Sequence, residues 1–267
     1  MLRRVFCAVG VSSLLIAAPL SVAGAADMSM PLKAPFSSPP SAYTWSGCYI
    51  DAGFGYGMYG LNTGLVDAAT GAALNAELDQ SGKGWLGRFG GGCDYQLGGS
   101  LSSWVIGAFG DFDTSDIEGS HTGADPTVVG LDSGNMKLRD SWSAGGRIGY
   151  VMFPQLMTYF DGGYTQAHFG GTTYATAGGA PDGFGVGSQT YSGWFLGGGT
   201  EYALNFSWLP IPGLFWRNEY RFSEYDAKNL TVFATATGAP TGVLESTKPY
   251  VQTITSSLVW RFNWMGR

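Results

Sequence analysis

The chain has 267 residues, of which 43 are glycine, 15% are aromatic and only 13% are charged. An average soluble domain carries roughly 7% glycine and 25% charged residues, so a soluble surface of this size would be short of charge. The apolar fraction of 45% with a net charge of −6 excludes a disordered chain, and glycines without a three-residue period exclude collagen.

Residues 1–25 have the features of a secretory signal peptide. Arg3 and Arg4 precede an apolar run over residues 5–18, and residues 23–25 match an A-x-A cleavage pattern. Cleavage leaves 12 basic against 20 acidic residues, a mature charge of −8, which argues against a nucleic-acid partner. The apolar run is too short to span a bilayer, and no other window reaches the roughly 18 uninterrupted apolar residues that a transmembrane helix needs. We therefore expect the chain to be exported.

Residues 26–44 follow the signal peptide and carry four prolines among small residues, with no hydrophobic period. This composition is typical of an extended tether. Beyond it, only two cysteines remain, Cys48 and Cys93. Two cysteines cannot form a zinc site alone, but they can pair in an exported chain.

From Trp45 onward the dominant signal is an alternation of period two, which is typical of strands with two different faces. In the first segment Ile50 and Phe54 lie on an apolar face, and Asp51 lies among glycines on the other. The fifth segment is ambiguous, because aromatic residues fall on both of its faces. The eight expected strands are residues 47–58, 84–97, 103–113, 140–151, 157–169, 192–204, 214–223 and 250–262.

The connections between these strands alternate in length. Those at 98–102, 152–156 and 205–213 are short, whereas the other four run to roughly twenty residues or more, which is long for a compact soluble domain. Short periplasmic turns and long extracellular loops are typical of outer-membrane barrels. We therefore predict an all-β fold over residues 45–262, an up-and-down antiparallel transmembrane β-barrel. It has eight strands, or ten if the long connections extend into a further hairpin.

The two strand faces agree with this fold. A sheet can span a bilayer only by closing on itself, with its apolar face toward lipid and its charges inside. Eight strands enclose a lumen just wide enough for side chains to fill, so we expect paired charges to plug it. A narrow pore lined by the same charges is the alternative. The predicted lumen charges are Asp51, Arg88, Asp111, Arg147, Glu201, Arg217, Glu219 and Arg221.

Cys48 and Cys93 are equally distant from the centre of the first expected hairpin, which would place them opposite each other on the lipid face. Opposed residues bring their Cβ atoms within roughly 4.5 to 5.5 Å, close to what a disulfide needs. A long connection does not fix the register, however. A disulfide and two separate thiols acting as small apolar side chains are both open.

Several segments together resemble the outer-membrane immunogenic, porin-like β-barrel proteins of Gram-negative bacteria. They are ADM at 26–28 with PLKAP at 31–35, YTWSGCYI at 43–50, GGRIGY at 145–150, GGGTEY at 197–202, EYRF at 219–222 and LVWRF at 258–262. Each is weak alone, but they span nearly the whole mature chain in the order found in the family. Cys48 departs from the pattern, since the family usually carries an aromatic or other apolar residue there.

The resemblance implies an eight-stranded OmpA-type barrel, inserted by the outer-membrane assembly machinery through an aromatic C-terminal strand. Leu258, Trp260 and Phe262 would form this insertion signal, with residues 263–267 as a C-terminal extension that the family does not lead us to expect. The tether would then lie in the periplasm, and the protein in the outer membrane of a Gram-negative cell.

The function we expect is structural: a surface-exposed, non-enzymatic barrel that contributes to envelope integrity, without cofactor or metal. A small-solute porin is the alternative, followed by a surface adhesin or a lipid-modifying enzyme. An enzyme would need a site such as Ser192 with His168, yet Glu201 would lie far below them. The expected partners are outer-membrane lipid, lipopolysaccharide and the assembly machinery, and no oligomeric state is predicted.

Overall fold

The computed structural model describes residues 44–124, 131–176, 178–205 and 211–262. The predicted signal peptide (1–25), the tether up to residue 43 and the extension (263–267) lie outside the described residues. No helix in the described part of the chain is long and apolar enough to cross a bilayer.

The described residues form strands and one short 3-10 helix. The elements are β1 (Gly47–Asp67), β2 (Leu78–Gln96), η1 (Gly99–Leu101), β3 (Trp104–Ala124), β4 (Leu131–Phe153), β5 (Leu156–Phe169), β6 (Thr172–Ala175), β7 (Pro181–Val186), β8 (Gln189–Ala203), β9 (Leu214–Tyr225), β10 (Lys228–Ala234) and β11 (Pro240–Phe262).

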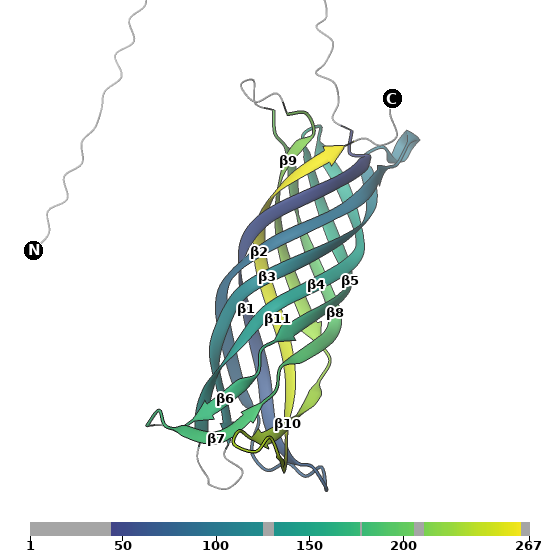
Figure 1. Cartoon of the computed structure of the whole chain (residues 1–267). Coiled ribbons are helices and arrows are strands. Elements are labelled where there is room, and N and C mark those ends of the chain that lie inside the picture. The colour runs from purple at the N-terminus through teal and green to yellow at the C-terminus, as the bar shows by residue number, and fades with distance from the viewer. Residues whose placement is uncertain (1–43, 125–130, 177, 206–210, 263–267) are drawn as a thin grey trace, which may run out of the picture. The chain divides into compact units, whose positions relative to one another are not determined.

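Eight of these strands close an antiparallel ring in the order β1-β2-β3-β4-β5-β8-β9-β11, and β11 pairs back onto β1. The closing pair is continuous from Cys48 opposite Phe262 to Asp67 opposite Val243. Figure 1 shows the strands winding obliquely around the barrel. Closure pairs the backbone groups of the two edge strands, as a bilayer requires. The predicted eight-stranded barrel is confirmed.

Much of the sequence expected to form long connections continues the strands. β1 runs to Asp67, and β11 begins at Pro240, about ten residues before the expected start. Three other strands are continued by a short strand after a break of two residues. β6 follows β5, β7 precedes β8, and β10 follows β9. β6, β7 and β10 pair in series between β4 and β11. These segments therefore extend the barrel wall, with β6, β7 and β10 as additional short strands.

The two ends of the barrel differ. Gly47 and Phe262 lie at the end with the short connections, where η1 is found, and the strand extensions lie at the opposite end. In outer-membrane barrels the short turns are periplasmic. We call the first end periplasmic and the second extracellular.

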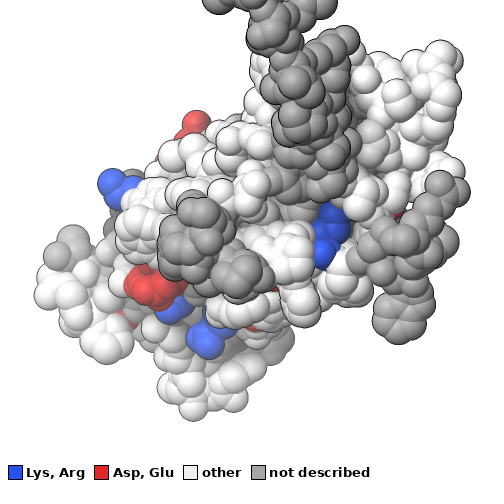
Figure 2. Space-filling model, turned by 90° about the horizontal axis from the view of Figure 1, so that it is seen from above, with Lys and Arg blue, Asp and Glu red and all other residues white. Residues whose placement is uncertain are grey.

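The outer surface carries a broad apolar band. Many large apolar side chains are exposed on it; Phe160, for example, is 76% exposed and Phe54 is 65% exposed. Soluble proteins rarely expose an apolar patch of this extent. Aromatic pairs flank the band, with Trp104 on Tyr150 toward the periplasmic end and Tyr56 on Trp85 toward the other. Figure 2 looks onto the periplasmic end of the barrel rather than its wall, and there charged atoms are seen in a few small groups among uncharged ones. The apolar outer band fits lipid.

The fifth strand, ambiguous in sequence, has a definite register. Phe160 and Tyr164 point outward, whereas Tyr159 and Phe169 are buried inside the barrel. Aromatic residues on both faces therefore reflect an interior that is itself partly apolar.

The interior changes character along the barrel axis. We call the part bearing the apolar outer band the spanning half, which in β1 covers residues 48–58, and the part beyond it the extracellular half, residues 59–67 of β1. The spanning half encloses the charged side chains. The extracellular half encloses two apolar clusters, one around Tyr59 and Phe169 and one around Leu65 and Val232. A third cluster, around Trp45 and Phe215, closes the periplasmic end.

Candidate functional site

The candidate site is the charged interior of the spanning half. All eight charges predicted for the lumen have their side chains inside the barrel, where they are almost completely shielded from water. They come from β1, β2, β3, β4, β8 and β9, because in each of these strands the period-two alternation places every second residue inward. Such charges cost free energy to bury unless each is paired and hydrogen-bonded.

Glu201 of β8 is the centre of the periplasmic cluster. It is 0% exposed and contacts three arginines. Its Oε2 accepts from Arg217 Nη2 at 2.9 Å and from Arg147 Nη1 at 3.3 Å. Its Oε1 accepts from Arg261 Nη2 at 2.7 Å. One carboxylate thus joins β4, β8, β9 and β11 across the lumen.

Asp94 of β2 and Asp51 of β1 complete this cluster. Arg147 makes a two-point contact with Asp94, with its Nε 2.8 Å from Oδ1. Arg261 Nη1 donates to Asp94 Oδ2 at 2.6 Å, and Arg217 Nη1 donates to Asp51 Oδ2 at 3.1 Å. Two-point arginine–carboxylate contacts are among the stronger and more directional hydrogen bonds in proteins. The first and last strands of the barrel are therefore linked through side chains as well as backbone.

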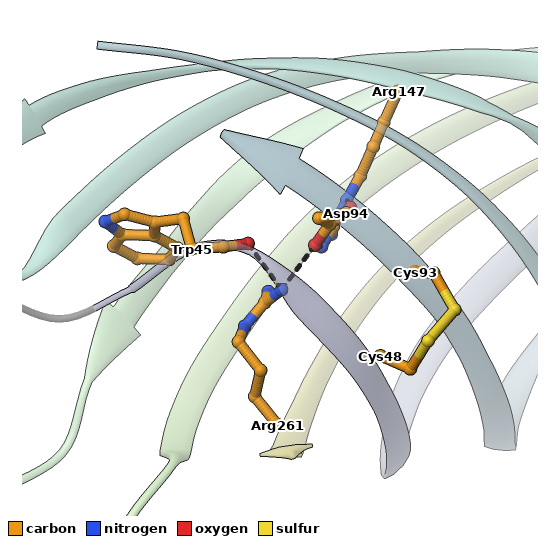
Figure 3. Close-up of a disulfide and its surroundings, with 6 residues drawn as sticks. All are labelled: Trp45, Cys48, Cys93, Asp94, Arg147 and Arg261. Atoms are coloured by element: carbon orange, nitrogen blue, oxygen red, sulfur yellow. Dashed lines mark hydrogen bonds and ion pairs between the residues drawn. A yellow bond between two sulfur atoms is a disulfide. The ribbon is translucent and has the colours of Figure 1, made fainter. Parts of the chain in front are cut away.

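Figure 3 shows how this cluster meets the barrel seam. Arg261 Nη1 also donates to the backbone carbonyl of Trp45 at 2.9 Å, so one guanidinium holds both the entry to β1 and Asp94 of β2. Cys48 and Cys93 lie directly opposite each other on the same two strands and are joined by a disulfide, with their sulfurs 2.02 Å apart. Near the periplasmic end Arg261 of β11 thus reaches across the seam to the start of β1, and the disulfide joins β1 to its other neighbour, β2.

Glu219 of β9 is the centre of a second cluster, farther from the periplasmic end. Its Oε1 lies 2.7 Å from Arg88 Nη1 and 2.8 Å from Arg221 Nη2. Its Oε2 accepts from the Tyr159 hydroxyl at 2.9 Å. Each arginine also makes a two-point contact with an aspartate, Arg88 with Asp113 at 2.7 and 2.8 Å and Arg221 with Asp111 at 2.9 Å twice.

Aromatic rings contribute to holding the guanidiniums. The Tyr49 ring lies 4.7 Å from Arg147, 4.6 Å from Arg217 and 5.2 Å from Arg261. The Phe195 ring lies 4.3 Å from Arg221. Cation–π contacts of this kind are stronger when the partners are shielded from water. The rings also occupy space that water would otherwise fill.

The side chains of the two clusters leave a small cavity between them. The cavity between the two clusters has a volume of about 10 Å³ and is lined by residues of both, among them Asp51, Arg88, Arg147, Asp161 and Glu219. A cavity of this size holds about one water molecule. In the described part of the chain, no three His, Cys, Asp or Glu side chains converge so as to hold a metal ion.

Four further charges of the network were not among the predicted site residues: Asp94, Asp113, Asp161 and Arg261. The sequence could have indicated them, since each lies at an inward-facing position of a strand that was already predicted. What the sequence could not show is that Arg261 of β11 reaches across the lumen to Asp94 of β2.

The extracellular half holds a buried polar group that the sequence did not indicate. His121 Nε2 lies 2.5 Å from Glu245 Oε1, and the Tyr174 hydroxyl donates to Glu245 Oε2 at 2.5 Å. Both His121 and Glu245 are 0% exposed, although residue 245 falls in one of the long connections expected between strands. Burial and the neighbouring carboxylate raise the pKa of Tyr174 well above its usual value. The group joins β3, β6 and β11 inside an apolar surrounding.

The residues weighed for a lipid-modifying enzyme do not form one site. His168 Nδ1 lies 3.1 Å from Thr190 Oγ1 on the outer surface, and Ser192 Oγ accepts from Gln166 at 3.3 Å. Glu201 lies in the lumen with three arginines. The carboxylate of Glu201 and the imidazole of His168 therefore lie on opposite sides of the barrel wall.

The residues of the predicted insertion signal lie on the last strand, β11. Leu258 and Trp260 are about half exposed on the apolar outer band, and Phe262 pairs with Cys48 at the periplasmic end. The described chain thus ends on the lipid face.

No family model matches the chain. It is 28% identical over 212 residues to the 31 kDa outer-membrane immunogenic protein of Brucella melitensis biotype 1, covering 74% of this chain and 78% of that one. The protein of the same name from Brucella suis biovar 1 gives the same figures.

Three solved structures were also found to be similar. They are OprG of Pseudomonas aeruginosa (12% identity, 81% of this chain and 97% of that chain, TM-score 0.49), Neisserial surface protein A (12%, 81% and 98%, 0.39) and Ail of Yersinia pestis (12%, 81% and 99%, 0.36).

The closed ring with its apolar outer band and the relationship to the Brucella proteins lead to the same assignment. The chain is a β-barrel protein of the Gram-negative outer membrane and a homologue of the outer-membrane immunogenic proteins.

Proposed function

We propose that the protein is a structural, non-enzymatic barrel whose lumen is closed by its ion-pair network and which contributes to envelope integrity. The observation that carries this proposal is the pair of clusters around Glu201 and Glu219. Five arginines and their carboxylate partners fill the spanning half and leave a cavity of about 10 Å³. A solute larger than water would have to displace buried ion pairs, and breaking such a pair costs about 3 to 5 kcal/mol.

Conductance measurement tests the closed lumen. The full mature protein is refolded into planar bilayers, and single-channel current is recorded. We expect no steady open state. Arg221→Ala, which removes a guanidinium from the lumen wall, is the matched control and should conduct more than the wild type. A steady, large conductance of the wild type would instead support the small-solute porin.

A deletion strain tests the contribution to the envelope. We expect increased sensitivity to detergents and to large hydrophobic antibiotics, restored by the wild-type gene. Restoration by Arg221→Ala would show that the barrel acts without a closed lumen. Unchanged sensitivity in the deletion strain would contradict the structural role and favour a surface function such as adhesion.

Three interactions belong to the same proposal. The apolar outer band is expected to contact outer-membrane lipid and lipopolysaccharide, and Leu258, Trp260 and Phe262 are expected to be read by the assembly machinery. The name of the Brucella relatives supports exposure of the extracellular half as a surface antigen.

Antibody binding to intact cells tests that exposure. An epitope tag, recognised by the antibody, is inserted in the turn at Gly71, which is exposed at the extracellular end. We expect intact cells to be labelled. Labelling only after permeabilisation would show that the barrel has the opposite orientation.

A further inference from the structure

The charges of the lumen do not balance. In the described residues the spanning half encloses seven carboxylates and five guanidiniums, an excess of two negative charges. The carboxylates are Asp51, Asp94, Asp111, Asp113, Asp161, Glu201 and Glu219, and the guanidiniums are Arg88, Arg147, Arg217, Arg221 and Arg261. An uncompensated charge in a water-poor interior is costly, so the excess calls for a bound positive charge.

Asp161 of β5 is the place where the imbalance is found. The other six carboxylates each lie within ion-pair distance of at least one arginine. In the described part of the chain Asp161 has no such arginine, and neither of its oxygens has a hydrogen-bond partner, although the residue is only 5% exposed.

The neighbouring strands explain why Asp161 is left over. Arg147 is opposite Asp161 in the β4–β5 register, but its guanidinium is held by Asp94 and Glu201. On the other side, Asp161 is opposite Gly197 of β8, which has no side chain to offer. A Cβ at Gly197 would lie 2.3 Å from Asp161 Oδ1, so glycine is what leaves room for the carboxyl.

The cavity of about 10 Å³ lies beside Asp161 and is lined by groups that can complete a small site. Besides Asp161, the cavity is lined by the carboxylates of Glu219 of β9, Asp51 of β1 and Asp111 of β3 and by Tyr49, and Tyr159 lies near enough to Asp161 to interact with it electrostatically. The positive groups are Arg88 of β2, Arg147 of β4, and Arg217 and Arg221 of β9, all of them already paired. Thr255 and Ser257 of β11 add hydroxyl oxygens.

We propose that Asp161 and this cavity form a binding site for one monovalent cation, either a proton or a sodium ion, which would neutralise one of the two excess negative charges. The size of the cavity excludes organic cations. The carboxylates of Asp51, Asp111 and Glu219 are already paired with arginines, so Asp161 is left to offer its oxygens, fewer than a divalent metal takes. A proton would let Asp161 donate to the Glu219 carboxylate, and a sodium ion would be held by carboxylate and hydroxyl oxygens. The inference rests on the closed lumen of the proposed function but is tested by stability rather than by conductance, so each can fail separately.

The test compares the full mature wild type with Asp161→Asn in detergent, using the loss of the compact gel form on heating and circular dichroism. One series varies pH. A second replaces sodium chloride by choline chloride at constant ionic strength. If the ligand is a proton, the folded-to-unfolded ratio of the wild type should fall about tenfold per pH unit as pH rises through the titration, because the folded state holds a proton that the unfolded state has lost. If it is sodium, the ratio should rise in proportion to sodium concentration above the dissociation constant.

Asp161→Asn should remove whichever dependence the wild type shows, because the amide brings no charge to neutralise. Asp113→Asn is the matched control: it removes a carboxylate paired with Arg88, so it should lower stability yet keep the cation dependence. If Asp161→Asn does not refold, Asp161→Ala deletes the same charge and serves in its place. A wild type insensitive to both pH and sodium, or a dependence that persists unchanged in the Asp161 variants, would overturn the site.

Discussion

The spanning half and the extracellular half of the barrel are built from the same strands, but their polarity is reversed. In β1 of the spanning half, Ile50 and Phe54 face outward and Asp51 faces inward. In the extracellular half of the same strand, Asn62 faces outward while Leu61 and Leu65 are buried inside. The fold is one continuous ring, so the difference reflects what surrounds each half. Lipid outside requires charges inside, and water outside permits an apolar core.

Each half therefore depends on a different interaction. The spanning half has a lumen of ion pairs around Glu201 and Glu219, where the loss of one partner leaves others buried without a counter-charge. The extracellular half has close-packed rings, such as Tyr59 against Phe169 and Phe169 against Tyr191, as the core of a soluble barrel does.

The largest expected effect is that of Glu201→Ala. It would leave Arg147, Arg217 and Arg261 without their shared carboxylate, and we expect a loss of about 3 to 5 kcal/mol of unfolding free energy. Urea unfolding in lipid vesicles, followed by tryptophan fluorescence, measures it. Glu224→Ala is the matched control, since it removes an exposed pair with Lys248 and should cost about 0 to 1 kcal/mol. Equal losses of unfolding free energy in the two variants would contradict the central place of Glu201 in the periplasmic cluster.

A charge placed on the outer surface of each half compares their surroundings directly. Phe54→Arg puts a guanidinium into the apolar band and should cost about 2 to 4 kcal/mol, whereas Asn62→Arg, eight residues on and also outward, should cost about 0 to 1 kcal/mol. The same vesicle unfolding assay applies. If Asn62→Arg proved as costly as Phe54→Arg, the apolar environment would have to reach into the extracellular half.

The disulfide joins β1 to β2 and is found in the spanning half only. Cys48→Ala with Cys93→Ala should lower the unfolding free energy by about 2 to 4 kcal/mol, mainly by freeing the unfolded chain. The reduced wild type is the control, because it has the same sequence without the bond. Non-reducing peptide mass spectrometry establishes the starting state, and two freely alkylated thiols in the folded protein would contradict the bond.

The smallest expected effect lies in the turn after β1. Thr70 donates its hydroxyl and its backbone N–H to Asp67 Oδ1, each at 2.8 Å, and these hydrogen bonds lower the pKa of Asp67. A depressed pKa stabilises the folded turn above the unfolded pKa, and this contribution is lost as pH falls through the folded pKa. Thr70→Ala should therefore raise the pKa of Asp67, as measured by NMR titration, and leave the barrel otherwise unchanged. An unchanged titration would show that the hydroxyl contributes nothing.

The sequence predicted the fold well where lipid imposes a strict alternation. In β2, Trp85 and Phe89 face lipid and Arg88 faces the lumen. Because a charge facing lipid would be costly, the alternation is strict here, and the strand, its two faces and the lumen charge could all be assigned. The symmetry of the first expected hairpin also suggested that Cys48 lies opposite Cys93, which the sequence left open and the structure shows.

The rest could not be predicted for two physical reasons. Beyond the lipid, the alternation reverses and weakens, so Glu245 and His121 were not recognised as buried and the strand extensions were not assigned. Within the lumen, a face assignment does not say which charges meet. Asp161 and Asp94 are both placed on the inward face by the alternation. Among the described residues, however, Asp161 has no ion-pair partner, whereas Asp94 binds two arginines.

The reversal of polarity can be measured directly with spin labels on the outward positions of β11. Labels at Leu258, Ile254, Lys248 and Ser246 are introduced one at a time in vesicles, with the native disulfide intact, and their accessibility to oxygen and to a water-soluble nickel chelate is compared. The reversal of polarity predicts access to oxygen at Leu258 and Ile254 and to nickel at Lys248 and Ser246. Nickel access at all four positions, or oxygen access at all four, would contradict it.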